Sequence, residues 1–301
     1  MKELVILSGK GGTGKTSLTA SFAAMAGGCL LCDADVDAAD LHLLMQPVIR
    51  KRTDFKGGGV AVIDPQRCTE CGTCIELCRW SAIRTDFVVD EIACEGCGVC
   101  VDFCPEQAID FPTKTCGQWF ISDTRFGPMV HARLGIAEEN SGKLVSLVRQ
   151  QARQLAESRR IDLIITDGPP GVGCPVIASV GGANSALIVA EPTVSGIHDM
   201  ARAIDLCHHF KVPVMVCINK FDLNPENTAT IEHMSRDGGL PVVGRIPFDA
   251  AFTRAMVQGQ TLLEYDGNGA AGSHLRQLWA DIMHSPAMTT QLSTPMKQGA
   301  M

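Results

Sequence analysis

Eight of the fourteen cysteines lie between residues 68 and 104, at spacings that suit metal binding. They form two runs, each with three thiols at every third position and a fourth thiol four positions later. The runs are Cys68, Cys71, Cys74 and Cys78, and then Cys94, Cys97, Cys100 and Cys104. In a reducing cytoplasm, so many clustered thiols predict metal ligation rather than disulfides.

This spacing is that of a bacterial ferredoxin segment with two [4Fe–4S] clusters. Three close thiols bind one cluster, and the trailing thiol of that run ligates the other cluster. The predicted ligand sets are Cys68, Cys71, Cys74 and Cys104 for cluster 1, and Cys94, Cys97, Cys100 and Cys78 for cluster 2. Zinc is the competing metal, but four-cysteine zinc sites usually use two C-x2-C pairs separated by a longer loop. Arg79 follows Cys78 where the ferredoxin run has proline, and ligation should survive this difference.

A second group of residues fits phosphate binding. The G-x-x-x-x-G-K-[ST] pattern lies between a predicted strand and a predicted helix, which is the context that the motif requires. Its residues, with the serine that follows, are Gly9, Lys10, Gly11, Gly12, Thr13, Gly14, Lys15, Thr16 and Ser17. Backbone N–H groups of such a loop surround the phosphates. We expect Lys15 to contact the β- and γ-phosphates and Thr16 to coordinate Mg²⁺.

Lys10 makes this a deviant Walker A motif. In this the chain resembles the MinD/ParA/Mrp family of P-loop ATPases, and it is also similar to the nitrogenase iron protein. In that family two protomers enclose two nucleotides, and this lysine crosses the interface to the partner's nucleotide. The resemblance implies a homodimer on nucleotide binding, with Lys10 catalytic in trans. The alternative is a solvated lysine beside the phosphates of its own chain.

Two acidic segments match further features of the family. Asp33-Ala-Asp35 resembles switch I, in which the second aspartate positions the attacking water, and Asp37 is the rival of Asp35. These carboxylates could instead cap a helix or act on Mg²⁺ through water. Asp167, followed by Gly-Pro-Pro-Gly171, resembles Walker B and switch II and would hold Mg²⁺. The predicted catalytic residues are Lys10, Lys15, Asp35 and Asp167.

Asn219 and Cys174 are the least specific of the candidate site residues. Asn219 begins an Asn-Lys-Phe-Asp motif, typical of guanine recognition, but an asparagine at this place in the MinD-like family contacts adenine. The resemblance therefore favours ATP, with GTP as the alternative. Cys174 follows Asp167 at the offset where the nitrogenase iron protein has a cysteine that helps to hold a cluster between subunits. It is a candidate extra ligand, with Cys116 as a candidate partner, or else a structural or free thiol.

The elements that must position these residues alternate between strand and helix. A strand over 3–7, a helix over 15–26 and a strand over 29–32 form a β-α-β unit, which predicts a parallel sheet. The alternation of strands and helices resumes after residue 112, and buried strands are predicted over 163–166, 186–190 and 214–218. The predicted fold is α/β, a doubly wound, mostly parallel P-loop NTPase sheet of the MinD-like type, with an inserted small α+β ferredoxin-like domain. Residues 1–59 and 113–285 are assigned to the ATPase domain, 60–112 to the insert, and 286–301 to a disordered tail.

Composition restricts the partners. The 301-residue chain has a net charge of -7, which argues against a nucleic-acid surface because phosphate contacts need clustered Lys and Arg. No apolar run is long enough to span a bilayer, and no secretory signal precedes the first strand. We therefore expect a cytoplasmic protein without stable membrane insertion.

Three functional classes follow from this combination. In the first, ATP hydrolysis gates electron transfer through the two clusters to a redox partner. In the second, the protein assembles or carries clusters for an accepting protein, as Mrp-like relatives do, although the C-terminal C-x-x-C of the carrier type is absent. The third, a positioning or regulatory ATPase like MinD itself, is remote, because residues 274–284 do not form a basic membrane helix. The segments 138–143 and 191–196 also resemble the family but have no assigned role.

Overall fold

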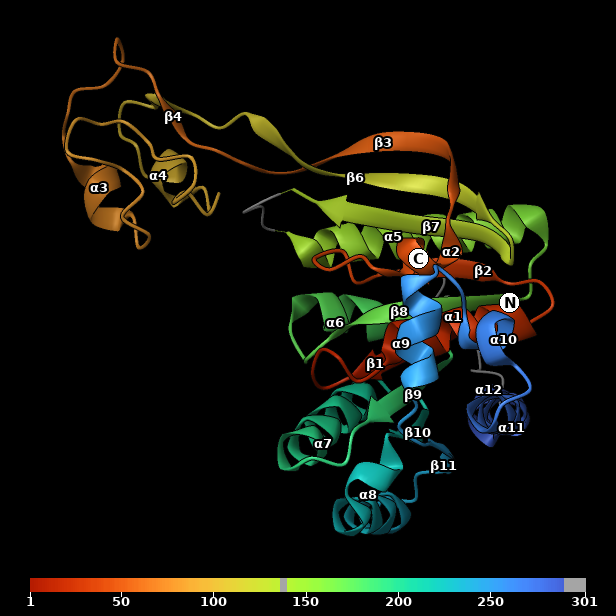
Figure 1. Cartoon of the computed structure of the whole chain (residues 1–301). Helices are drawn as coiled ribbons and strands as arrows, with labels where there is room; N and C mark the ends of the chain where they lie inside the picture. Colours follow the sequence, from red (N-terminus) through yellow and green to blue (C-terminus); the bar gives the residue numbers. More distant parts are fainter. Residues whose placement is uncertain (136–139, 290–301) are drawn as a thin grey trace, which may run out of the picture.

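The computed structural model describes residues 1–135 and 140–289, and a nine-stranded sheet forms the centre of this part (Figure 1). The sheet has the order β11-β10-β9-β1-β8-β2-β7-β6-β3. Its strands are β1 (Lys2–Ser8), β2 (Leu30–Asp33), β3 (Val48–Gly59), β6 (Thr113–Thr124), β7 (Gly127–Leu134), β8 (Leu163–Pro170), β9 (Ser185–Ala190), β10 (Val214–Asn219) and β11 (Val242–Ile246). All neighbours from β11 to β7 are parallel, whereas β6 is antiparallel to both β7 and β3. The mostly parallel α/β sheet predicted from the sequence is confirmed.

Helices cover both faces of the parallel strands. One face packs against α1 (Lys15–Met25), α9 (Ala250–Val257), α10 (Leu262–Asp266) and α11 (Ala270–His284). The other packs against α5 (Ser141–Arg159), α6 (Cys174–Val180), α7 (Val194–His209) and α8 (Pro225–Asp237). Because both faces are covered, β1, β9 and β10 are almost continuously apolar instead of alternating.

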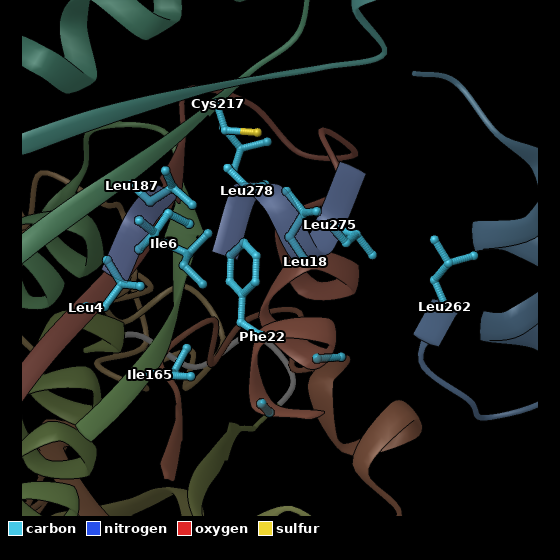
Figure 2. Close-up of a cluster of buried hydrophobic side chains, with 14 of the residues drawn as sticks. Leu4, Ile6, Leu18, Phe22, Ile165, Leu187, Cys217, Leu262, Leu275 and Leu278 are labelled. Atoms are coloured by element: carbon cyan, nitrogen blue, oxygen red, sulfur yellow. The ribbon is translucent and has the colours of Figure 1, made fainter. Parts of the chain in front are cut away.

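A hydrophobic core lies between α1 and β1, the strand that leads into the phosphate-binding loop (Figure 2). Leu4 and Ile6 of β1 lie beside Leu18 and Phe22 of α1, and all four are buried. Phe22 also stacks on Trp279 of α11, with 5.2 Å between the ring centroids. The packing holds α1 against β1, and so it fixes the loop between them.

A long antiparallel hairpin was not predicted from the sequence. β3 pairs with β6, and β6 pairs with β7, so three strands extend the sheet beyond β2. β3 lies at the edge of the sheet and contains the exposed run Arg50, Lys51 and Arg52. It therefore lacks the alternation of apolar and polar residues by which a strand is predicted. Lys51 lies over the ring of Trp119 and Arg52 over that of Phe120, both on β6.

The cysteine-rich segment, residues 60–112, lies at the far end of this hairpin, away from the parallel strands (Figure 1). It has its own two-stranded sheet of β4 (Val62–Ile63) and β5 (Ile109–Asp110) and two short helices, α3 (Thr73–Leu77) and α4 (Val99–Asp102). β3 ends at Gly59 and β6 begins at Thr113, so the cysteine-rich stretch of the sequence lies between these two strands.

The sequence repeat of this segment reappears in its backbone hydrogen bonds. The N–H of Asp64 donates to the carbonyl of Ala108 (2.8 Å), and 26 residues away the N–H of Asp90 donates to that of Ala82 (2.7 Å). The pairing of Ile63 with Ile109 likewise has its counterpart in a bridge between Ile83 and Val89. The two halves of the segment are therefore related by approximate twofold pseudosymmetry.

The predicted disordered tail is wrong at its start. Residues Pro286–Thr289 form α12, and Met288 is 2% exposed, with its sulfur 2.7 Å from the Ser185 hydroxyl. Burial of this methionine against β9 explains why these small and polar residues form a helix. The rest of the predicted tail, 290–301, lies outside the described residues, as do positions 138 and 139 of the segment 138–143.

Among the helices of the described ranges, none is long and apolar enough to cross a membrane.

Candidate functional site

The predicted phosphate-binding residues form the turn between β1 and the start of α1. Gly12 and Gly14 have positive φ angles of 76° and 95°, and α1 begins at Lys15. Glycine is required at Gly14 for a second reason, because a Cβ there would lie 2.5 Å from the Asn219 side-chain nitrogen. The Thr13 hydroxyl oxygen is buried without a hydrogen-bond partner. The loop thus has the turn geometry and an unpaired polar atom that suit a phosphate ligand.

Two buried carboxyl groups lie together at the end of the sheet, and Lys15 lies near one of them, Asp167. Asp33 and Asp167 are direct register partners on β2 and β8, and they are 0% and 1% exposed. Burial, then the nearby Asp167 and Asp35 charges, raise the pKa of Asp33 well above its ordinary value. Burial also raises the pKa of Asp167, against the opposing effect of Lys15, while burial lowers the pKa of Lys15 itself.

These carboxyl groups could hold a divalent cation. Asp167 accepts a hydrogen bond from the Thr19 hydroxyl (3.1 Å), and Asp33 Oδ2 is buried without a partner. Thr16, at the start of α1, lies near Asp167 and opposes the rise in the pKa of that carboxyl group. A hydroxyl and carboxylate oxygens are the ligands that Mg²⁺ prefers. Thr16 and Asp167 therefore lie together, as a magnesium site would require.

Asp35 and Asp37 differ in their surroundings. Asp35 is half-buried and senses the charges of Lys15 and Asp167, whereas Asp37 is exposed. Burial raises the pKa of Asp35 to about 6, with Lys15 opposing the shift. Of the two rivals for a role at the phosphates, Asp35 is the one that faces the buried charges.

Lys10 makes an ion pair that the sequence did not predict. Its Nζ lies 2.9 Å from Glu191 Oε2 and 3.1 Å from the hydroxyl of Thr193. Lys220 pairs with the other oxygen of Glu191 at 2.8 Å and also donates to the Gly12 carbonyl at 3.2 Å. Glu191 follows β9, and β9 is the neighbour of β1, so an acidic residue at that strand end was the available signal.

A pocket of about 180 Å³ opens beside the phosphate-binding loop. Gly12, Gly14, Ser17 and Asn219 line one side of it. The other side was missed by sequence reasoning and comes from the segment after β11, namely Pro247, Phe248, Asp249, Phe252, Thr253 and Met256. Its position at the carboxyl end of a parallel strand was the available signal, since ligands of open α/β sheets bind there.

Asn219 and Asp222 both make contacts inside the protein at this pocket. The Asn219 side-chain nitrogen donates to the Thr13 carbonyl at 2.7 Å, so it supports the phosphate-binding loop. Asp222 Oδ1 accepts the N–H of Phe248 at 2.7 Å and thereby fixes the far wall. The Asn-Lys-Phe-Asp motif thus shapes the pocket from two sides.

The eight clustered cysteines line two separate pockets. One pocket is lined by Cys68, Cys71, Cys74 and Cys104, and the other by Cys78, Cys94, Cys97 and Cys100. In each pocket the trailing cysteine of one run joins the three close cysteines of the other. Within the described ranges, no three His, Cys, Asp or Glu residues converge as ligands of one metal ion.

Backbone N–H groups point at several of these sulfurs. Ala82 donates to Cys78 Sγ at 3.4 Å, and its repeat counterpart Ala108 donates to Cys104 Sγ at 3.3 Å. Gly72 and Gly98 have φ angles of 81° and 75° and let the chain turn into α3 and α4 beside the close cysteines. The pockets therefore combine thiols, apolar walls and amide donors to sulfur.

The other six cysteines lie outside these pockets. Cys29, Cys32, Cys207 and Cys217 are buried, as expected of core residues, and burial raises the pKa of Cys207 and of Cys217 to about 12. Cys174 is exposed at the start of α6. Cys116 is buried on β6, and its sulfur contacts the Gly57 carbonyl.

The raised pKa of Asp35 predicts a pH-dependent stability. The folded state holds the Asp35 proton more tightly than the unfolded state, so stability is lost as pH rises from about 4 through about 6. Asp35→Asn should therefore be more stable than the wild type at pH 7 without nucleotide, and the gain should vanish near pH 4. Urea denaturation at several pH values measures this, with the exposed Asp205→Asn as control. A gain that is the same at every pH would refute the prediction.

Comparisons with known proteins agree with this geometry. Residues 4–262 match the CobQ/CobB/MinD/ParA nucleotide binding domain. An uncharacterized protein of Methanocaldococcus jannaschii is 30% identical over 283 residues, which cover 93% of this chain and 96% of that protein. A Caenorhabditis elegans protein named cytosolic Fe-S cluster assembly factor NUBP1 homolog is 27% identical over 122 residues, 35% of this chain and 39% of that protein.

Solved structures share the fold. The septum site-determining protein MinD of Pyrococcus horikoshii, in complex with Mg-ADP, superposes with a TM-score of 0.58 at 14% identity, over 93% of this chain and 95% of that chain. The family model spans the phosphate-binding loop, both acidic segments and the pocket beside them. The chain therefore belongs to the CobQ/CobB/MinD/ParA family of P-loop nucleotide-binding proteins.

Proposed function

We propose that this protein is an ATPase that carries two [4Fe–4S] clusters and uses ATP in a homodimer to gate electron transfer through them. The observation that carries the proposal is the division of the eight cysteines between two pockets. We assign residues 1–59 and 113–285 to the nucleotide-binding domain and residues 60–112 to an inserted ferredoxin-like domain. A cytoplasmic location is part of the proposal, because free thiols persist in a reducing compartment.

The nucleotide half of the proposal places ATP in the loop and pocket beside α1. Lys15 would contact the phosphates, Thr16 and Asp167 would hold Mg²⁺, and Asp35 would orient the attacking water. The base would enter the 180 Å³ pocket between Asn219 and Phe248. ATP is preferred to GTP, because the family match covers far more of the chain than the Asn-Lys-Phe-Asp motif does.

The cysteines and amide donors of the segment 60–112 fit two iron–sulfur clusters. We assign Cys68, Cys71, Cys74 and Cys104 to one cluster and Cys94, Cys97, Cys100 and Cys78 to the other, since each set surrounds its own pocket. The amide donors of Ala82 and Ala108 would stabilise sulfur that carries negative charge. When bound, the clusters supply one-electron redox chemistry, with a potential set by such hydrogen bonds and by solvent exposure.

The cysteine assignment predicts the metal content. Protein purified without oxygen should contain about eight irons per chain. Cys104→Ser should lower this to about four and remove one cluster's paramagnetic signal, because the variant loses a ligand of one site only. Iron analysis and electron paramagnetic resonance of the reduced protein measure both, with Thr69→Ser, a non-thiol position in the same pocket, as the control that keeps all the iron. Stoichiometric zinc in place of iron would sink the assignment.

Lys10 carries the dimer half of the proposal. In the single chain it is paired with Glu191 beside the phosphate-binding loop, so a nucleotide phosphate would compete for its charge. We expect Lys10→Ala to abolish ATP-dependent dimerisation while the monomer still folds. Sedimentation with and without ATP tests this, and the exposed Lys211→Ala should dimerise as the wild type does. A Lys10→Ala variant that still dimerises with ATP would refute the role in trans.

A cluster carrier is the second candidate function. It is favoured by the C. elegans relative that is named as an iron–sulfur cluster assembly factor, although the match spans 39% of that protein. The two candidates separate when the cluster-loaded protein is incubated with an apo-ferredoxin and ATP. Gating of electron transfer predicts an unchanged iron content and a nucleotide-dependent potential, whereas transfer of iron and sulfide would favour the carrier.

A further inference from the structure

We propose that Asn140 is a positioning residue that links the loop after Asp167 to the cluster 2 pocket. This rests on the proposed function and names the route by which nucleotide would act on one cluster. The route runs through close contacts at glycines, from the phosphate-binding loop to α5 and from α5 to the root of the β3–β6 hairpin.

The first contact joins the two loops at the phosphate site. The N–H of Gly171 donates to the carbonyl of Ser8 at 2.9 Å, and the Ser8 hydroxyl donates to the carbonyl of Lys10 at 2.6 Å. Gly171 has a φ of 89°, so the chain turns at this point, directly after β8. A change at the γ-phosphate would therefore reach residue 171 through two hydrogen bonds.

The second contact passes from this loop to α5. A Cβ added to Gly142 would lie 3.3 Å from Cys174 Cβ and 3.4 Å from the Cys174 carbonyl carbon, so the start of α5 rests directly on the end of the loop. Farther along α5, the buried Arg149 donates to the carbonyls of Ala178 and Gly181 at the other end of α6. Helices α5 and α6 are thus joined at both ends and should move together.

The third contact passes from α5 to the hairpin root. Asn140 precedes α5 with a φ of 77°, and its side chain makes no capping hydrogen bond to the helix. It lies instead against Gly58, where an added Cβ would be 3.0 Å from the Asn140 side-chain nitrogen. The short Asn140 side chain is therefore the contact through which a displacement of α5 would reach β3.

The last contact reaches the loop of cluster 2. A Cβ on Gly96, which lies between Cys94 and Cys97, would be 2.6 Å from the Gly59 carbonyl oxygen. Asn140, Gly58, Gly59, Gly96 and Cys94 also line one shared pocket, so the contacts meet at a single joint. The cluster 1 cysteines do not line this pocket, and the route therefore favours cluster 2.

Hydrogen exchange of the full chain tests the link. Binding of Mg²⁺ with a non-hydrolysable ATP analogue should alter amide exchange at residues 91–98, as well as at residues 9–17 where the nucleotide binds. Asn140→Gly keeps the positive φ but removes the side chain, and it should lose the effect at 91–98 while keeping that at 9–17. Gln150→Ala, on the exposed side of α5, is the matched control and should keep both effects.

A second variant should disturb the same contacts in the absence of nucleotide. Gly142→Ala places a methyl group against Cys174 and should change exchange at 91–98 without nucleotide. In cluster-loaded protein, Asn140→Gly should also abolish the nucleotide-dependent shift of the cluster 2 potential, which a purely structural role would leave in place.

Three results would overturn the link: no change at 91–98 in the wild type although 9–17 is protected, an Asn140→Gly variant that keeps the change, or a Gly142→Ala variant without effect. Failure of the proposed function is a separate result. A chain without iron that still shows the coupled exchange would end the cluster proposal and leave the mechanical link intact.

Discussion

The buried charges at the carboxyl end of the sheet are the constraint on which the rest of the structure depends. Asp33 and Asp167 are register partners on adjacent parallel strands, so pairing of β2 with β8 forces two carboxyl groups together away from water. Like charges at such a distance disfavour each other's ionised forms, and Lys15 offsets only part of this cost. A divalent cation with a phosphate ligand would relieve it, so these buried charges favour the binding of Mg²⁺ with a nucleotide.

The cysteine-rich segment is compatible with this site because it enters the fold beyond the parallel strands. The chain leaves the sheet after β3 and returns with β6, at the sheet's edge, so the strands that carry the charges keep their neighbours. Communication between the two parts must then pass through the hairpin root. The close approaches of Gly58 to Asn140 and of Gly96 to Gly59 are among the contacts there.

Sequence reasoning succeeded where a motif fixes both the residues and the element that holds them. The β1–loop–α1 unit is of this kind, because glycines, lysine and a buried apolar strand occur together. It failed where a contact joins segments far apart in sequence, as in the Glu191 pairs with Lys10 and Lys220 or the pocket wall after β11. β3 was missed because its charged exposed face hides the strand period, and α12 because one buried methionine decides its order.

The charged edge of β3 has a consequence for how copies of the chain can meet. An edge strand offers unpaired N–H and C=O groups that could template the sheet of another molecule, and lysine and arginine are among the means by which proteins prevent this. Arg50, Lys51 and Arg52 would face the same positive run on a second copy, so their repulsion opposes runaway edge-to-edge polymerisation. Self-association is thereby left to other faces of the molecule, where it can stop at a closed, finite assembly.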